Sequence, residues 1–369
     1  MSNDEIKNGN ISEEHLTEFL SQFLQKMPNY NEKSMMNSFL SRQQVSDKTV
    51  ADCIEAILGA CLLSLGIERS FNILKLFKIL PNNPNTDYSQ LLQTQFASPR
   101  LRTNIANQEI DAFLINAHRL ENRLGYKFKD RAYLLQALTH PSYPTNQVTG
   151  CYQQLEFLGD AVLDMLVSAY IYEKCPNMGP GRLTDLRSAI VNNITLACLC
   201  VRYDFHLFIL SQNAVLSEKI AKFVAFQEQY NHEVTEQVML LVAESDVRLG
   251  EFIDVPKALG DIFEALIGGV FLDSGNNLDV TWKVLYGLLK HELEKFVINI
   301  PLEVVRRLYE YPNANPKFDD PYVEDDIVMV NVRFTKKRHI LQAKGFGENK
   351  ENAKRAAAKA ALHCLMEEK

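Results

Sequence analysis

Apolar residues recur at helical spacing over most of this 369-residue chain. Because apolar positions three and four apart share one face of a helix, we predict helices over residues 11–80 and again over 113–300. The stretch between them, 81–112, contains the Pro- and Asn-rich PNNPNTDYSQ and predicts a linker. Residues 213–256 predict a helical insertion within the second region.

The pattern changes period towards the C-terminus. The stretch YVEDDIVMVNVRFTKKRHILQAKGFG alternates apolar and polar residues as paired strands do, and NKENAKRAAAKAALHCLMEE predicts a final Ala-rich helix. With the preceding helix PLEVVRRLYEY, residues 301–369 predict an α-β-β-β-α domain. The predicted fold class is therefore mainly α, with a small α+β domain at the C-terminal end.

The chain also contains a weak internal repeat. VADCIEAILGACLLSLG resembles LGDIFEALIGGVFLDSG, since both have Asp-x-x-Glu followed by an apolar run. The acids of the first copy are Asp52 and Glu55, and no partner acids precede them in these residues. We therefore predict that residues 1–80 are the C-terminal half of an incomplete first domain, and that 113–300 form a complete second one.

Acidic residues interrupt the apolar pattern of the second domain. LEFLGDAVLDML places Glu156 and Asp160 four residues apart, on one face of a helix, and the later apolar helix carries Asp261 and Glu264 three apart. Carboxylates are rarely buried without a partner. If the two helices pack side by side, these four acids converge. Asp164 continues the first stripe, and we expect a structural role for it.

Converging carboxylates repel one another, and their pKa values rise unless a cation compensates. A ligand set of oxygen atoms favours Mg²⁺ or Mn²⁺ over zinc. Such ions act on phosphates, because they position a phosphodiester and activate water. Gly159, directly before Asp160, leaves room beside the predicted site because it has no side chain.

Charge is unevenly distributed along the chain. The formal net charge is −7, which argues against a protein that coats nucleic acid with its whole surface. Residues 336–359, however, contain eight Lys or Arg and two acids. The start, MSNDEIKNGN, is unlike a signal peptide, and the apolar runs are too short to span a bilayer. We expect no membrane partner and a cytoplasmic location.

Several motifs in order resemble the ribonuclease III family: ALTHPSY, LEFLGDAVLD, RLTDLRSAIVNN and DIFEALIGG. The resemblance implies a helical endonuclease domain that cuts double-stranded RNA with Mg²⁺ or Mn²⁺. The family's metal-binding and catalytic acids match Glu156, Asp160, Asp261 and Glu264. Its domains work in pairs, within or between chains, and leave products with 5′-phosphates and short 3′ overhangs.

Residues 301–369 resemble a double-stranded RNA-binding domain. The family's Lys-Lys-x-Ala-Lys helix start is represented here by Lys350 and Lys354, with Arg355 next to them, and these three are the expected RNA-binding residues. Glu351 stands where the second lysine is expected, and the loop between the first strands lacks the usual Gly-Pro-x-His. Lysines at a helix start suit phosphates across an A-form groove.

Two features resemble the Dicer subgroup, namely the long insertion and the half domain that precedes the complete one. That resemblance gives Asp52 and Glu55 to an incomplete first metal site. It also implies that Lys257, one turn before Asp261, neutralises phosphate charge. The implied activity is the production of small RNAs for silencing, with double-stranded RNA and a further RNA-binding protein as partners.

Two alternatives stay open at this point. One alternative is a simple ribonuclease III that works as a homodimer on ribosomal or messenger RNA. A non-catalytic scaffold that binds duplex RNA on the same fold is the other alternative, although such a protein has no need of the complete acid set.

Overall fold

The structure is a computed structural model. It describes residues 46–80, 96–101, 106–229, 231–234, 255–301, 304–324, 327–347 and 349–366. The helices predicted before residue 46 and the later part of the predicted insertion lie outside the described residues. Its helical content confirms the predicted fold class, mainly α with a small sheet near the C-terminus.

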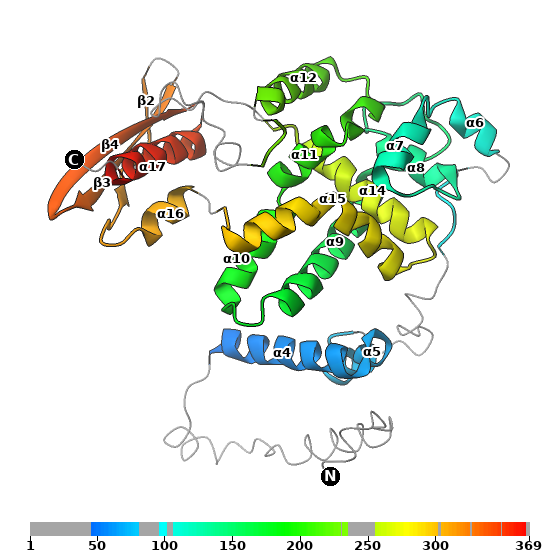
Figure 1. The fold of residues 1–369 in the computed structure, drawn as a ribbon, viewed down its shortest axis with the longest axis horizontal. Coiled ribbons are helices and arrows are strands. Elements are labelled where there is room, and N and C mark those ends of the chain that lie inside the picture. Colours follow the sequence, from blue (N-terminus) through cyan, green and yellow to red (C-terminus); the bar gives the residue numbers. More distant parts are fainter. Residues whose placement is uncertain are drawn as a thin grey trace, which may run out of the picture. The chain divides into compact units, whose positions relative to one another are not determined.

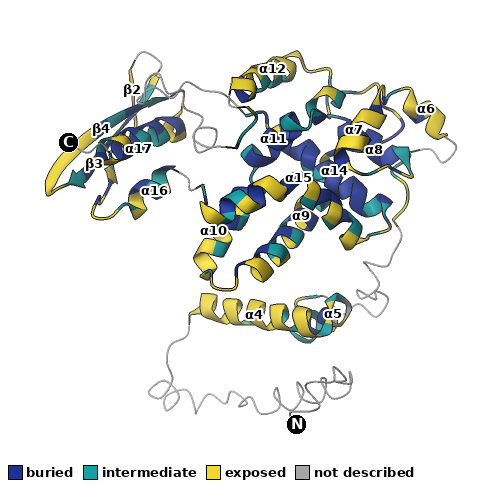
Figure 2. Ribbon diagram, viewed as in Figure 1, coloured by how far each residue is buried: buried dark blue, intermediate teal, exposed yellow. Residues whose placement is uncertain are grey.

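The chain divides into two units, residues 1–91 and 92–369, and each is described by itself. The first unit contains α4 (Asp47–Leu65) and α5 (Ile67–Leu76), and Ser46 caps α4 by accepting a hydrogen bond from the Thr49 amide. No residue of α4 is buried, although its sequence is strongly apolar (Figure 2). Asp52 and Glu55 lie exposed on this helix.

The second unit begins with a helical domain (Figure 1). Its α-helices are α6 (Asn107–Asp111), α7 (Ala117–Leu124), α8 (Arg131–Leu138), α9 (Gln153–Lys174), α10 (Pro180–Val191), α11 (Asn193–Arg202), α12 (Ala214–Gln229), α14 (Lys257–Asp273) and α15 (Leu278–Ile298). Several of these helices begin at an N-cap residue: Asp130, Asn192 and Asn277 accept capping hydrogen bonds. Helix α10 begins at Pro180.

Helix α14 lies at the centre of this domain. Nearly all of its residues are buried, and α8, α9, α11 and α15 pack around it (Figure 2). Burial on every side explains why its sequence is apolar on all faces instead of one. Any polar side chain on α14 therefore lies inside the domain or at the rim of its core.

The backbones of α9 and α14 approach each other closely where two glycines face. A Cβ atom on Gly159 would lie 1.9 Å from the carbonyl oxygen of Glu264, and one on Gly268 would lie 2.4 Å from the carbonyl oxygen of Leu155. No side chain fits in either space. The glycines therefore allow the contact that sets the acids of one helix against those of the other.

Part of the predicted linker packs on the helical domain. Ile110 of α6 is fully buried in the core, and Arg100 forms an ion pair with Asp130 at 2.6 Å. The Leu101 amide donates to the carbonyl of Val148 at 2.9 Å. The described residues from 96 onwards thus contribute to this domain, which the weak polar pattern of that stretch did not indicate.

The C-terminal domain places two helices on one face of an antiparallel sheet. Its elements are α16 (Val304–Glu310), β1 (Lys317–Phe318), β2 (Tyr322–Glu324), β3 (Ile327–Lys336), β4 (His339–Gly347) and α17 (Lys350–Met366). Both β1 and β2 pair with the same edge of β3, so they form one strand interrupted around Pro321. The predicted α-β-β-β-α order is confirmed, with its first strand broken.

Two further features complete the description. The turn between β3 and β4 has positive φ at Lys337 and Arg338, as a tight two-residue hairpin requires. Within the described residues, none of the helices combines the length and apolar character that a bilayer crossing requires.

We predict that Gly159→Ala destabilises the protein by about 2 kcal/mol or more, because the added methyl group forces α9 away from α14. Gly287→Ala is the matched control, since this exposed glycine of α15 has open space around its Cβ position. The control should gain up to about 1 kcal/mol from better helix propensity. Urea unfolding of both variants tests this, and equal stabilities would contradict the close contact.

Candidate metal centre

The four predicted acids lie where α9 meets the first half of α14. Glu156 and Asp160 are one turn apart on α9, and Asp261 and Glu264 occupy neighbouring positions on α14. The glycine contact brings the two helices together at this level. The sequence prediction depended on such side-by-side packing, and the structure provides it.

Three of these carboxylates converge. One oxygen each of Glu156, Asp261 and Glu264 lies within 4.8 Å of the others, which makes this the acidic group among the described residues that is able to hold a metal ion. Asp160 is exposed and lies beside the group instead of within it. A three-residue cluster with a fourth acid at its rim is therefore the geometry of the predicted site.

Burial and mutual repulsion act on these carboxyl groups. Burial raises the pKa of Glu264 to about 8, and the charges of Asp160, Asp261 and Glu156 add to the shift. Burial likewise raises the pKa of Asp261, partly offset by its hydrogen bond with Lys257. Although Asp160 is exposed, partial loss of solvent and the charges of Asp164 and Glu156 raise the pKa of its carboxyl group. The site holds more negative charge than its protein surroundings compensate.

Lys257 supplies the positive charge within reach. Its Nζ donates to Glu156 Oε1 at 3.0 Å and to Asp261 Oδ1 at 2.5 Å, although 72% of its side chain is exposed. Burial lowers the pKa of Lys257, but the hydrogen bonds to Asp261 and Glu156 outweigh that effect and raise it to about 12. The ammonium therefore stays charged and bridges α9 and α14.

Tyr152 is a contact of the site that the sequence reasoning missed. Its hydroxyl donates to Asp261 Oδ2 at 3.2 Å, and the residue is 5% exposed. The sequence does contain one indication of this contact. Tyr152 is four residues before Glu156, so the two side chains lie on the same side of α9 at its start. Its partner, however, lies 109 residues further along the chain.

The donor set fits a hard divalent cation. Carboxylate oxygens are the ligands that Mg²⁺ and Mn²⁺ favour, and no cysteine or histidine belongs to the described cluster. The ammonium of Lys257 is itself a cation, and it already lies between Glu156 and Asp261. These two acids therefore accommodate positive charge at this place. The ammonium makes no such contact with Glu264, and burial is the main cause of the raised pKa of that carboxyl group.

The other predicted residues lie elsewhere. Asp164 faces Arg187 of α10, with Nε 3.7 Å from Oδ1, as a structural role requires. Asp52 and Glu55 are exposed on α4, and the described residues add no third acid to them. Lys350 is exposed at the start of α17, while Lys354 and Arg355 are partly buried one turn later.

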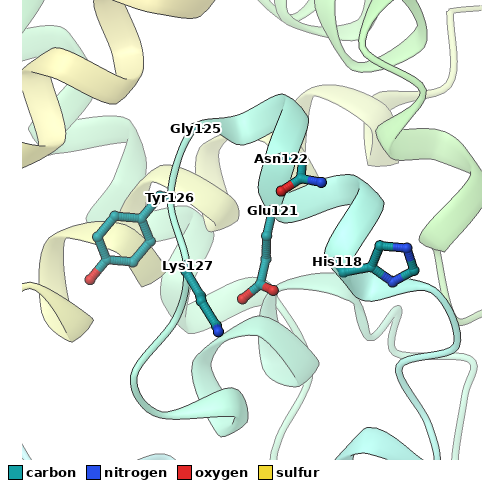
Figure 3. A pocket seen from close by; sticks show the side chains of 6 residues that line it. All are labelled: His118, Glu121, Asn122, Gly125, Tyr126 and Lys127. Atoms are coloured by element: carbon teal, nitrogen blue, oxygen red, sulfur yellow. The ribbon is translucent and has the colours of Figure 1, made fainter.

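A pocket separate from the acids lies at the end of α7. Its lining is drawn in Figure 3 and consists of His118, Glu121, Asn122, Gly125, Tyr126 and Lys127. The hydroxyl of Tyr126 donates to Asp273 Oδ2, at the last residue of α14. Asp273 is twelve residues after Asp261, or roughly 18 Å along the helix.

Comparison with known proteins relates two parts of this sequence to known domain families. Residues 153–275 match the model of the ribonuclease III domain, and residues 281–369 match that of the Dicer, dsRNA-binding domain. The first match contains all four acids and Lys257. The second includes most of α15 as well as the whole C-terminal domain.

Curated relatives extend this result. Endoribonuclease Dcr-1 of Drosophila melanogaster is 37% identical over 89% of this chain and 16% of its own length. Endoribonuclease Dicer of Danio rerio is 39% identical over 88% of this chain and 18% of its own length. The chain thus spans less than a fifth of these relatives.

Among solved structures, the nuclease domain of ribonuclease III from Campylobacter jejuni is 29% identical, with a TM-score of 0.34. That comparison covers 48% of this chain and 97% of the other. The two family models and the curated relatives agree along the sequence. The chain therefore contains a domain of the ribonuclease III family, followed by a double-stranded RNA-binding domain of the Dicer type.

Proposed function

We propose that this chain is the C-terminal part of a Dicer-type enzyme that hydrolyses double-stranded RNA with a divalent cation, Mg²⁺ or Mn²⁺. The observation that carries the proposal is the convergence of Glu156, Asp261 and Glu264 within 4.8 Å, in a domain that matches the ribonuclease III model. A duplex-RNA-binding domain directly after it supplies the substrate class.

In this proposal, Glu156, Asp261 and Glu264 hold the cation, and Asp160 reaches it from the rim. A bound cation polarises a phosphodiester and lowers the pKa of water. Lys257 has a largely exposed side chain whose ammonium lies at the same place. We assign it the neutralisation of negative charge that develops on the phosphate, since an ammonium close to the phosphate stabilises a transition state more charged than the ground state.

We further propose that the nuclease domain pairs with another of its kind, each site cutting one strand. The exposed side of α9 supports this, because Phe157 is 81% exposed and Tyr172 is 60% exposed on the helix that carries the acids. Phe157 directly follows Glu156, so a partner domain that buries this ring would lie close to the acids. Products with 5′-phosphates and 3′ overhangs, and a place in cytoplasmic RNA silencing, belong to the same proposal.

The C-terminal domain is proposed to hold the duplex through the start of α17. Lys350 is exposed there, and the ammonium of Lys354 lies 5.0 Å from the centre of the Phe318 ring. That ring covers one side of the lysine and leaves its charge on the domain surface. Contacts of this kind recognise the phosphate backbone and the shape of the duplex.

We predict that Asp261→Asn reduces cleavage of duplex RNA by more than about 100-fold while the affinity for RNA is retained. The change removes a cation ligand but keeps the side-chain shape. Strand-specific gel assays in Mg²⁺ measure it. Asp164→Asn is the control, because it alters the same acidic stripe at the contact with Arg187 and should leave cleavage unchanged. Equal cleavage by Asp261→Asn and wild type would overturn the proposed function.

We predict that the stability of the metal-free protein falls as the pH rises from about 5 to about 8. The folded protein retains a proton on Glu264, whose pKa is about 8, whereas the unfolded chain loses it near the ordinary pKa of a glutamate, 4.5. The folded state therefore binds more protons in this window, and stability decreases with pH. Urea unfolding in chelator should show a smaller decline for Glu264→Gln. Mg²⁺, which binds the ionised carboxylate, should reverse the wild-type decline above pH 7.

We predict that the double change Lys350→Gln and Lys354→Gln weakens binding of every duplex RNA sequence alike. Each lost phosphate contact should reduce the slope of log affinity against log salt by roughly 0.7 to 0.9. Fluorescence anisotropy at several salt concentrations measures both effects. Lys222→Gln on α12 is the control, since this exposed lysine pairs with Glu218 away from the C-terminal domain. An unchanged slope in the double variant would contradict the assignment.

A further inference from the structure

The carboxylate of Asp261 is held from two sides. The ammonium of Lys257 donates to Oδ1, and the phenol of Tyr152 donates to Oδ2 at 3.2 Å. Each carboxylate oxygen accepts more than one hydrogen bond or ligand, so both oxygens keep capacity for a cation, and one of them lies within 4.8 Å of oxygens of Glu156 and Glu264. The two contacts differ in mobility, because the lysine side chain is 72% exposed and Tyr152 is 5% exposed.

Tyr152 is itself fixed by its surroundings. Its amide donates to the carbonyl of Thr139 at 3.0 Å, and its own carbonyl accepts from the amide of Glu156 at 2.8 Å, which begins α9. Its ring lies 5.8 Å from the ring of His140, centre to centre. A phenol has few rotatable bonds, so these contacts leave its hydroxyl one direction, towards Asp261.

The loop that holds Tyr152 is anchored in turn. His140 Nδ1 accepts a hydrogen bond from the Ser142 amide at 3.0 Å and lies 2.8 Å from the Ser142 hydroxyl, and these contacts limit rotation of the imidazole ring. The Ser142 hydroxyl is 3.0 Å from that of Ser211, three residues before the start of α12. The position of the phenol therefore depends on a network of contacts and not on one rotamer alone.

We propose that Tyr152 is a positioning residue of the metal site, whose hydroxyl fixes the Asp261 carboxylate so that it faces Glu156 and Glu264. The inference rests on the proposed function, since it concerns the affinity of that site for a divalent cation. Without the hydroxyl, Oδ2 loses its fixed donor, and the carboxylate is free to turn towards Lys257. Hydrogen bonds of this outer kind orient metal ligands and commonly change metal affinity 10-fold or more.

The fold offers a matched control on the same helix. Tyr126 donates its hydroxyl to Asp273 Oδ2 at 2.7 Å, at the opposite end of α14 (Figure 3 labels Tyr126). Tyr126→Phe and Tyr152→Phe each delete one Tyr–Asp hydrogen bond and keep the ring. A purely structural role predicts the same behaviour for both variants, whereas positioning of the metal site predicts a difference in metal affinity.

The test is Mn²⁺ binding to the full chain in the absence of RNA, measured by electron paramagnetic resonance. We expect Tyr152→Phe to bind Mn²⁺ about 10-fold more weakly than wild type and Tyr126→Phe to bind it normally. Cleavage by Tyr152→Phe should then be slow at low Mg²⁺ and recover at high Mg²⁺, with no change in the affinity for RNA. Circular dichroism of both variants checks that each remains folded.

The outcomes separate the two proposals. Equal Mn²⁺ affinity of Tyr152→Phe and wild type overturns the role of Tyr152 and leaves the proposed function intact. Equal weakening in both variants also overturns it, because the effect is then general to α14. If the wild-type chain binds neither Mn²⁺ nor Mg²⁺, the metal site of the proposed function fails together with this inference.

Discussion

The contact between the backbones of α9 and α14 is the constraint on which the rest of the nuclease domain depends. Gly159 and Gly268 leave no room for a side chain at the point of contact. The carbonyl of Glu264 occupies the space that a Cβ atom of Gly159 would need. As a result, acids on two helices separated by about a hundred residues lie within 4.8 Å of one another.

Bringing these carboxylates together destabilises the folded protein, and burial of the apolar core offsets that destabilisation. Burial and like charge raise the pKa of Glu264 and Asp261, which means that the ionised forms are destabilised in the folded protein. Helix α14 is buried among α8, α9, α11 and α15, so removing its apolar side chains from water holds the acids in place. Packing therefore holds the site together, and the ion pairs of Lys257 with Glu156 and Asp261 add to it.

Much of this arrangement follows from the sequence. The helical period predicts two acidic helix faces, one with Glu156 and Asp160 and the other with Asp261 and Glu264. The change of period towards the C-terminus predicts the C-terminal domain. The sequence gives no direct measure of how close two helices come, so the position of Asp160 at the rim was not predictable. The sequence places Ile110 in a linker, because scattered apolar residues in a polar stretch give no periodic signal.

The two groups that donate hydrogen bonds to Asp261 differ in how firmly the surrounding protein holds them. Lys257 approaches from solvent on a long side chain, whereas Tyr152 is enclosed by the loop before α9. An ammonium that reaches the acids from outside is able to move towards a phosphate without disturbing the carboxylates, provided that another group keeps them oriented. Tyr152 is the neutral group in contact with Asp261 that meets this condition, because a phenol orients a carboxylate without competing with a cation for its charge.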